Sequence, residues 1–262
     1  MTVFERKHVS VGGARIEYFI GGSGDPLIWL HGSEGNLGWL KIHDELARSF
    51  TVYVPTHPGF ASSERPKWVE SFLDLSRFYL WMVQELGLSK ATLAGHFIGG
   101  WLAAEMAVMT PQIVSRLMLI DAAGVRPRKS DITDIFLHGI EGTRQLSFFD
   151  LKQVVDYELL FAAKPTPESR EAHIVNREAV TRYCWKPYMH DPTLLQLLGR
   201  LRDLSTLVLW GREDRIVPLE CCEMYSKAIA GAHAEVIERC GHFPHLEKPA
   251  EFTRAIFSFL AK

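Results

Sequence analysis

The stretch Ala91-Thr92-Leu93-Ala94-Gly95-His96-Phe97-Ile98-Gly99-Gly100 decides the fold of this chain. It begins as a short apolar strand, reaches a Gly-x-x-x-Gly turn and continues into a helix-compatible segment, residues 101–109. Small residues at such a turn let the helix pack closely on the strand, and the sharp turn lifts its middle residue above the sheet. This layout is typical of a nucleophile elbow. The middle residue here is Phe97, and a phenyl ring cannot attack a carbonyl, so the sequence predicts an elbow without its attacking group.

Further apolar runs on both sides of the elbow are predicted strands. Residues 3–20 form two of them around the hairpin turn Gly12-Gly13, and the others lie at 26–30, 51–54, 116–121, 206–210 and 234–238. Helical patterns separate them, at 37–50, 69–86, 219–230 and after Pro249. Strands that alternate with helices predict an α/β fold, with a mostly parallel eight-stranded sheet and helices on both of its faces.

The alternation stops between residues 124 and 203. Amphipathic segments near 131–138, 148–161 and 168–183 replace the buried strands. We therefore expect an α/β core of residues 1–123 and 204–262 with an inserted helical cap, 124–203. Aromatic residues of the cap are expected to line a pocket or to pack the cap onto the core, namely Phe136, Phe148, Phe149, Tyr157 and Trp185.

Composition restricts the class of partner. The chain has 262 residues, of which 47% are hydrophobic, and its 29 basic and 31 acidic residues give a net charge of −2. Because the charges are mixed along the chain, no basic face is expected for nucleic acid or an anionic membrane, and a small-molecule partner is favoured. The chain shows neither an 18-residue apolar run nor the apolar core of a signal peptide, which predicts a cytoplasmic protein. The oligomeric state is not predicted.

Cysteines and histidines give no sign of a metal or cofactor. Cys184, Cys221, Cys222 and Cys240 lack the spacing of a disulfide framework and form no C-x-x-C pair. The 11 histidines are scattered, and no H-E-x-x-H motif occurs. We therefore expect no required metal and no cofactor.

Three more motifs follow predicted strands. H-G-S-E-G starts at His31, and a glycine-rich turn of this kind leaves backbone N–H groups free to face a developing oxyanion. W-G-R-E-D-x-x-V-P carries Asp214, and G-H-F-P-H-L-E-K-P carries His242. A carboxylate can hold an imidazole so that one ring nitrogen takes up a proton, which makes these two residues a candidate pair.

In this order the motifs resemble the α/β-hydrolase fold family, and the resemblance covers essentially the whole chain, including the cap position. H-P-G-F-A-S-S-E, at residues 57–64, resembles the capped ester and carbon–carbon bond hydrolases of that family. Matched residue by residue, the resemblance implies that Asp214 is the catalytic acid and His242 the catalytic histidine. It places Phe97 at the nucleophile position and assigns the oxyanion hole to the backbone amides of Ser33 and Ile98.

Simpler interpretations exist for each polar residue of this set. Asp214 and His242 can be ordinary turn residues, and Asp121, which ends the neighbouring strand, is a weaker substitute for the acid. His31, His96 and His245 are better explained as structural residues. Ser33, Ser62 and Ser63 can be proposed as displaced nucleophiles, but none of them lies in an elbow.

Two functions therefore remain open. In the first, the protein acts on a small, largely apolar ester or ketone-like substrate, with the His242/Asp214 pair as general base and an oxyanion hole but no serine. In the second, it is a non-catalytic ligand-binding pseudoenzyme in which Phe97 plugs the pocket floor. The retained acid–histidine pair favours the first function, and Phe97 favours the second.

Overall fold

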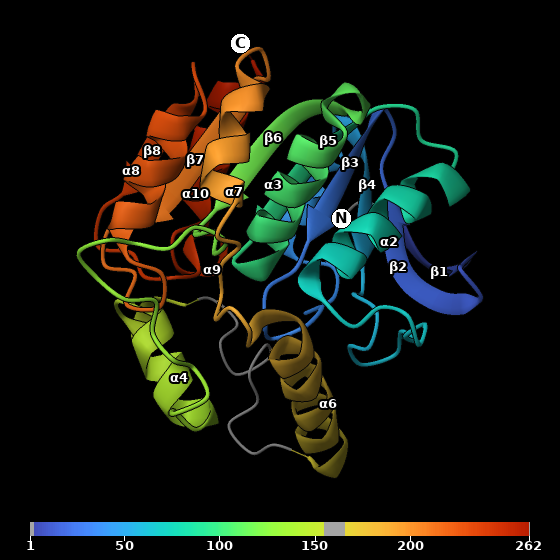
Figure 1. Cartoon of the computed structure of the whole chain (residues 1–262), viewed down its shortest axis with the longest axis horizontal. Coiled ribbons are helices and arrows are strands. Elements are labelled where there is room, and N and C mark those ends of the chain that lie inside the picture. Colours follow the sequence, from blue (N-terminus) through green and yellow to red (C-terminus); the bar gives the residue numbers. More distant parts are fainter. Residues whose placement is uncertain (1–2, 155–165, 262) are drawn as a thin grey trace.

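A computed structural model describes residues 3–154 and 166–261 of the chain. Its centre is an eight-stranded sheet with the order β1-β2-β4-β3-β5-β6-β7-β8 (Figure 1). The strands are β1 (Phe4–Val11), β2 (Ala14–Gly21), β3 (Asp25–Leu30), β4 (Phe50–Pro55), β5 (Ala91–His96), β6 (Val114–Ile120), β7 (Thr206–Gly211) and β8 (His233–Ile237). β2 pairs antiparallel with both β1 and β4, and all the other neighbours are parallel. The predicted α/β fold is confirmed.

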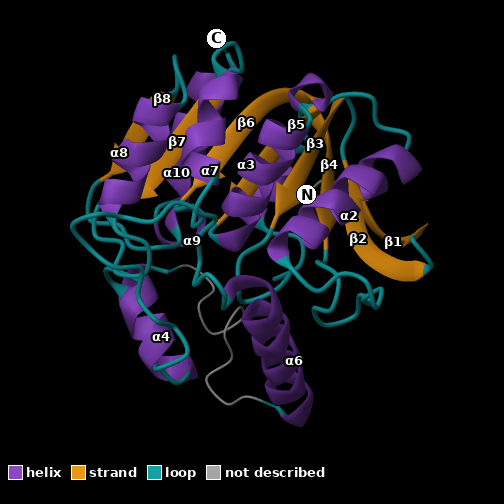
Figure 2. Cartoon of the chain, in the orientation of Figure 1, coloured by secondary structure: helices purple, strands orange, loops and turns teal. Residues whose placement is uncertain are grey.

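Helices cover both faces of this sheet (Figure 2). They are α1 (Lys41–Leu46), α2 (Phe72–Glu85), α3 (Ile98–Met109), α8 (Leu219–Ala228), α9 (Pro244–Glu247) and α10 (Pro249–Leu260), with a 3-10 turn η1 (Pro111–Ile113) after α3. Because successive side chains of a strand point to opposite faces, Ile28 and Leu30 join the core under α2, α3 and α8. Leu27 and Trp29 join the core under α1 and α10. No helix in the described ranges is long and apolar enough to cross a membrane.

Two sequence predictions of helices need correction. The predicted helix at 37–50 is reduced to α1, because Gly38 has a φ of 85° and the chain becomes helical only after Leu40. The segment 131–138 is not helical but consists of extended residues and turns. The apolar residues there do not share one side of the chain, since Ile135 is buried and Leu137 is 80% exposed.

The region between β6 and β7 contains α4 (Ile140–Ser147), η2 (Leu151–Gln153), α6 (Pro167–Cys184), α7 (Leu194–Leu197) and η3 (Leu198–Leu201). Figure 1 shows α4 and α6 standing away from the sheet, on the side to which β3, β5, β6 and β7 lead. In contrast, α7 and η3 pack against α3. The predicted helix at 168–183 lies within α6, and half of the one at 148–161, residues 155–161, lies outside the described residues. The division into core and cap at residues 124 and 203 stays a prediction.

Candidate functional site

The turn between β5 and α3 is an elbow with Phe97 at its tip. Phe97 has φ 53° and ψ −114°. A Cβ atom on Gly95 would lie 2.1 Å from the Gly99 carbonyl oxygen, and one on Gly99 would lie 2.1 Å from that of Leu30. Side chains do not fit at such distances, so the two glycines let the helix pack on the sheet. The positive φ is the conformation expected of an elbow, and it is strained for a bulky residue.

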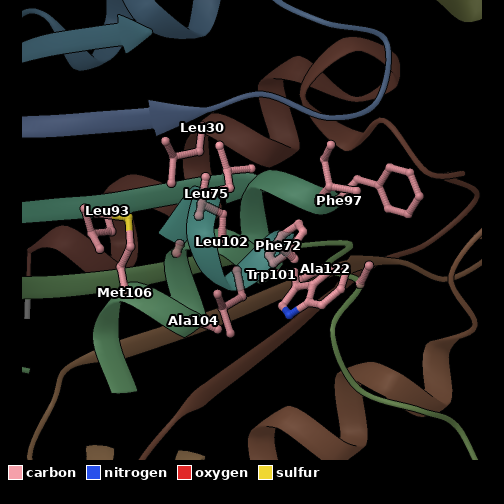
Figure 3. Close-up of a cluster of buried hydrophobic side chains, with 14 of the residues drawn as sticks. Leu30, Phe72, Leu75, Leu93, Phe97, Trp101, Leu102, Ala104, Met106 and Ala122 are labelled. Carbon is pink, nitrogen blue, oxygen red and sulfur yellow. The ribbon is translucent and has the colours of Figure 1, made fainter. Parts of the chain in front are cut away.

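The Phe97 side chain projects from the tip of this turn and lies beside His242. In Figure 3 its ring points away from the packed side chains of Leu30, Leu75 and Leu102. It meets the ring of His242 edge-to-face, with a centroid distance of 4.7 Å and an interplanar angle of 84°. Phe97 and His242 are each only 1% exposed. The phenyl ring therefore packs directly against the imidazole, and its occupation of a nucleophile's place stays a prediction.

The structure brings His242 and Asp214 together. His242 Nδ1 is 2.7 Å from Asp214 Oδ2, and both side chains are buried. Asp214 Oδ1 accepts hydrogen bonds from the amides of Ile216 and Val217, at 2.7 and 3.1 Å. The hydrogen bond through Nδ1 directs the other ring nitrogen of His242, Nε2, away from Asp214. Nε2 is buried without a hydrogen-bond partner in the described part of the chain. The distance meets the geometric requirement of an acid–histidine pair, whose catalytic role stays a prediction.

Asp121 lies beside this pair at the end of β6. Its Oδ1 accepts a hydrogen bond from the Gly211 amide at 2.9 Å. Burial, and secondly the charge of Asp214, raise the pKa of Asp121 well above its ordinary value. The hydrogen bond that Asp121 accepts comes from the strand β7 and not from the imidazole, and which of the two carboxyls acts as the acid stays a prediction.

Asp121, Asp214 and His242 also form a group whose candidate ligand atoms lie within 4.8 Å of one another. A metal ion there would have to displace the hydrogen bonds that Asp214 accepts from His242, Ile216 and Val217. The donor set therefore suits a hydrogen-bond network better than a metal centre.

The other buried histidines near the elbow are held by the backbone. Burial lowers the pKa of His31 to about 4 and those of His57 and His96 well below the ordinary value, so the three rings are neutral. His31 Nδ1 donates to the Gly32 carbonyl at 2.7 Å, and its Nε2 accepts from the His57 amide at 2.9 Å. His96 Nε2 donates to the carbonyl of His242 at 2.7 Å. His31 and His96 thus have the structural role that the sequence favours.

A cavity of about 630 Å³ lies between the loop that follows β3 and the helices α4 and α6. Its lining is mostly apolar and includes Leu37, Leu40, Ile135, Phe136, Ile140, Phe148, Val180 and Phe243. Of the predicted site residues only Ser33 lines it; Phe97, Ile98 and His242 are not among its described lining residues.

The aromatic residues predicted for this pocket divide into three groups. Phe136 and Phe148 line the cavity. Phe149 and Trp185 do not, and they are 42% and 51% exposed. Tyr157 lies outside the described residues.

The charged part of the cavity wall is mainly cationic. Arg144 and Arg177 contribute guanidinium groups from α4 and α6, and the exposed Arg170 adds a third. Burial and then the charges of Arg177 and Arg144 lower the pKa of His173, which also lines the cavity. The opposing carboxyl is that of Glu34, whose pKa is raised by burial. The sequence offers no motif for the arginines, whereas a charged residue inside the glycine-rich turn was a signal for Glu34.

A sequence model of the alpha/beta hydrolase family matches residues 22–255. The chain belongs to this family. Its similarity to the 2-hydroxy-6-oxo-2,4-heptadienoate hydrolase of Pseudomonas putida F1 is 28% identity over 273 residues, which cover 97% of this chain and 95% of the relative. The 2-hydroxymuconate semialdehyde hydrolase of Pseudomonas sp. CF600 is 29% identical over 287 residues, covering 98% and 94%.

Two solved structures have the same fold as this chain. The chain superposes on a mutant meta-cleavage product hydrolase from Pseudomonas fluorescens IP01, complexed with acetates, with a TM-score of 0.79 and 26% identity over 97% of each chain. A bacterial membrane phospholipase A gives a TM-score of 0.81 over 98% of this chain and 86% of the other, at 24% identity. The second comparison shows the fold alone.

Proposed function

We propose that this alpha/beta hydrolase relative is a non-catalytic binding protein for a small, largely apolar carboxylate, which it holds in the cavity under α4 and α6. The observation that carries the proposal is the position of Phe97. Its ring packs on His242, and neither residue is among the described residues that line the cavity. A ligand in the cavity then lies apart from the His242–Asp214 pair, and α4 and α6 act as the cap that encloses it.

Charge favours an anionic ligand. Arg144, Arg170 and Arg177 line the cavity together with one carboxyl, that of Glu34. Guanidinium groups bind planar carboxylates through paired, charge-assisted hydrogen bonds. The Thr143 hydroxyl also lines the cavity, and its oxygen is buried without a partner among the described residues. The apolar wall suits the remainder of an aromatic or acyl acid.

The similar proteins support the same class of ligand. The names of the two Pseudomonas relatives are those of enzymes that act on a dienoate and on a muconate semialdehyde, both carboxylates. The meta-cleavage product hydrolase structure contains acetates. Serine chemistry is not carried over to this chain, because Phe97 stands at the position that would supply the hydroxyl.

Calorimetric titration with benzoate and benzamide tests the proposal. Benzoate is expected to bind and the uncharged amide to bind at least tenfold more weakly, because a charge-assisted hydrogen bond contributes about 1.5–3 kcal/mol. The double variant Arg144→Gln/Arg170→Gln should lose the preference. The matched control is Arg48→Gln, an exposed arginine paired with Glu45 at 2.8 Å on α1. Equal affinity for benzoate and benzamide contradicts the proposal.

A second function has one specific observation in its favour. His242 keeps its bond to Asp214 and leaves Nε2 unpartnered, as a general base requires. If Phe97 moves aside, this nitrogen can take a proton from substrate or water without a serine. Turnover of phenyl esters or vinylogous 1,5-diketones by the unaltered protein, abolished by His242→Gln, would establish this function in place of simple binding.

A further inference from the structure

A second, much smaller cavity lies behind the loop that follows β3. Its volume is about 20 Å³, somewhat more than the ~10–15 Å³ that one water molecule requires. Glu34, His43 and His245 all line it. In each of these side chains one polar atom is buried without a hydrogen-bond partner in the described part of the chain, namely Glu34 Oε2, His43 Nε2 and His245 Nδ1. Three such atoms around one small cavity call for an occupant, since an unsatisfied buried polar atom costs about 1–3 kcal/mol.

The protonation of His43 decides the kind of occupant. His43 Nδ1 accepts a hydrogen bond from the Leu40 amide at 3.0 Å. Burial lowers the pKa of His43 to about 3, so the ring is neutral and carries its single hydrogen on Nε2. Nε2 can therefore only donate. A metal ion needs a lone pair at that atom, whereas a water molecule offers an acceptor oxygen.

The Glu34 carboxylate reaches this cavity from its wall. A Cβ atom on Gly32 would lie 3.1 Å from Glu34 Oε2 and 2.8 Å from His96 Nδ1. Gly32 lines the small cavity and is not among the described residues that line the large one. Oε2 therefore lies on the side of the small cavity, while Oε1 accepts a hydrogen bond from the Ser33 hydroxyl at 3.1 Å.

We propose that a single water molecule is a resident ligand of this small cavity and positions Glu34. It accepts a hydrogen bond from His43 Nε2 and donates one to Glu34 Oε2 and one to His245 Nδ1. All three unpartnered atoms are then satisfied, and the water makes the three hydrogen bonds typical of buried waters. The proton on His245 is consequently placed on Nε2.

The site has a consequence for the larger cavity. Glu34 lines both cavities, so the water fixes the carboxyl that opposes the arginines of α4 and α6. Removing the water leaves Glu34 free to turn toward Arg144, whose charge already acts to lower the pKa of this carboxyl against the larger effect of burial. Glu34 would then compete with a bound carboxylate for that guanidinium. This consequence rests on the proposed function, whereas the water site itself does not.

Two measurements on the full chain test the water site. A crystal structure at about 1.5 Å should show a density peak within about 3.2 Å of all three atoms. Oxygen-17 relaxation dispersion of the solvent should count one fewer long-lived water in His43→Phe, which fills the cavity and removes the donor. The control His233→Phe changes an exposed histidine of β8 and should leave the count unchanged. If His43→Phe does not fold, Glu34→Leu replaces it.

An empty cavity in the crystal overturns the proposal, and so does an unchanged water count in a folded His43→Phe or Glu34→Leu variant. Benzoate affinity then tests the positioning of Glu34 separately. It should fall at least threefold in His43→Phe and stay unchanged in His233→Phe. An unchanged affinity in His43→Phe refutes the positioning role. If benzoate does not bind the unaltered protein, the proposed function fails while the crystal and relaxation results still decide the water site.

Discussion

Replacing Phe97 by serine is expected to create or greatly raise hydrolysis of small activated esters by this chain. The phenyl ring is 1% exposed and packs on His242, so its removal opens the space that the ring filled beside the imidazole. A serine at the same elbow would place its hydroxyl beside that nitrogen, which could take the proton as the oxygen attacks. The amide of Ile98, at the start of α3, would then face the oxyanion.

The magnitudes follow from the burial of Phe97. Deletion of a buried phenyl ring costs about 3–5 kcal/mol of unfolding free energy, and a hydroxyl bonded to His242 should recover about 1 kcal/mol. Loss of the serine lowers kcat of a serine hydrolase by roughly 10⁶. We expect the serine variant to recover part of this factor. Phe97→Ser should exceed Phe97→Ala by on the order of 10² or more in the hydrolysis of p-nitrophenyl acetate.

The assay combines kinetics with detection of the covalent intermediate. Phe97→Ser should show a burst of nitrophenol and a fluorophosphonate adduct in intact-protein mass spectrometry. Phe97→Ala opens the same space without a nucleophile and should show neither, and His242→Gln in the serine background should abolish both. Urea unfolding establishes that each variant is folded. A folded serine variant with no adduct and no more activity than the alanine variant would refute the assignment of the elbow, His242 and Asp214.

Three further outcomes concern stability. Burial raises the pKa of Glu105 to about 7 from 4.5. Its contribution to stability is therefore complete below pH ~4.5 and is lost as pH rises through ~7. In urea titrations the unfolding free energy of the unaltered protein, relative to that of Glu105→Gln, should fall by up to about 3 kcal/mol across that window. Gly99→Ala should lower the unfolding free energy by about 3 kcal/mol or more, because the new Cβ would meet the Leu30 carbonyl. The control Gly139→Ala, with no atom within 4 Å of the new Cβ, should change it by less than about 0.5 kcal/mol. Similar values for the two variants would contradict the close packing of the elbow. Asn176→Ala removes two hydrogen bonds that join α6 to the backbone of Glu34 and Ala61, at 2.8 and 3.0 Å. The unfolding free energy should fall by about 2 kcal/mol, and amide exchange in α6 should become faster. Unchanged exchange would show that other contacts hold the helix.

Much of the fold could be read from local sequence. The strand at 91–96 and the Gly95–Gly99 spacing predict the elbow because only glycine fits where the Gly99 and Leu30 carbonyls lie so near. The structure differs from the sequence prediction where tertiary packing overrides the local hydrophobic pattern. The periodicity at 131–138 predicts a helix, yet the chain there follows the surface of its neighbours, with Ile135 turned inward and Leu137 outward.

The sequence by itself determined the alpha/beta hydrolase architecture, the order of its motifs and the absence of a nucleophile at Phe97, since each is a property of residues that are adjacent in the chain. Only the tertiary structure decided how these residues meet. Asp214 and His242 are 28 positions apart, and their 2.7 Å contact depends on β7 and β8 lying side by side. The larger cavity between α4, α6 and the loop after β3, and the gathering of Glu34, His43 and His245 around the small one, arise from packing between distant segments. No local pattern encodes those distances.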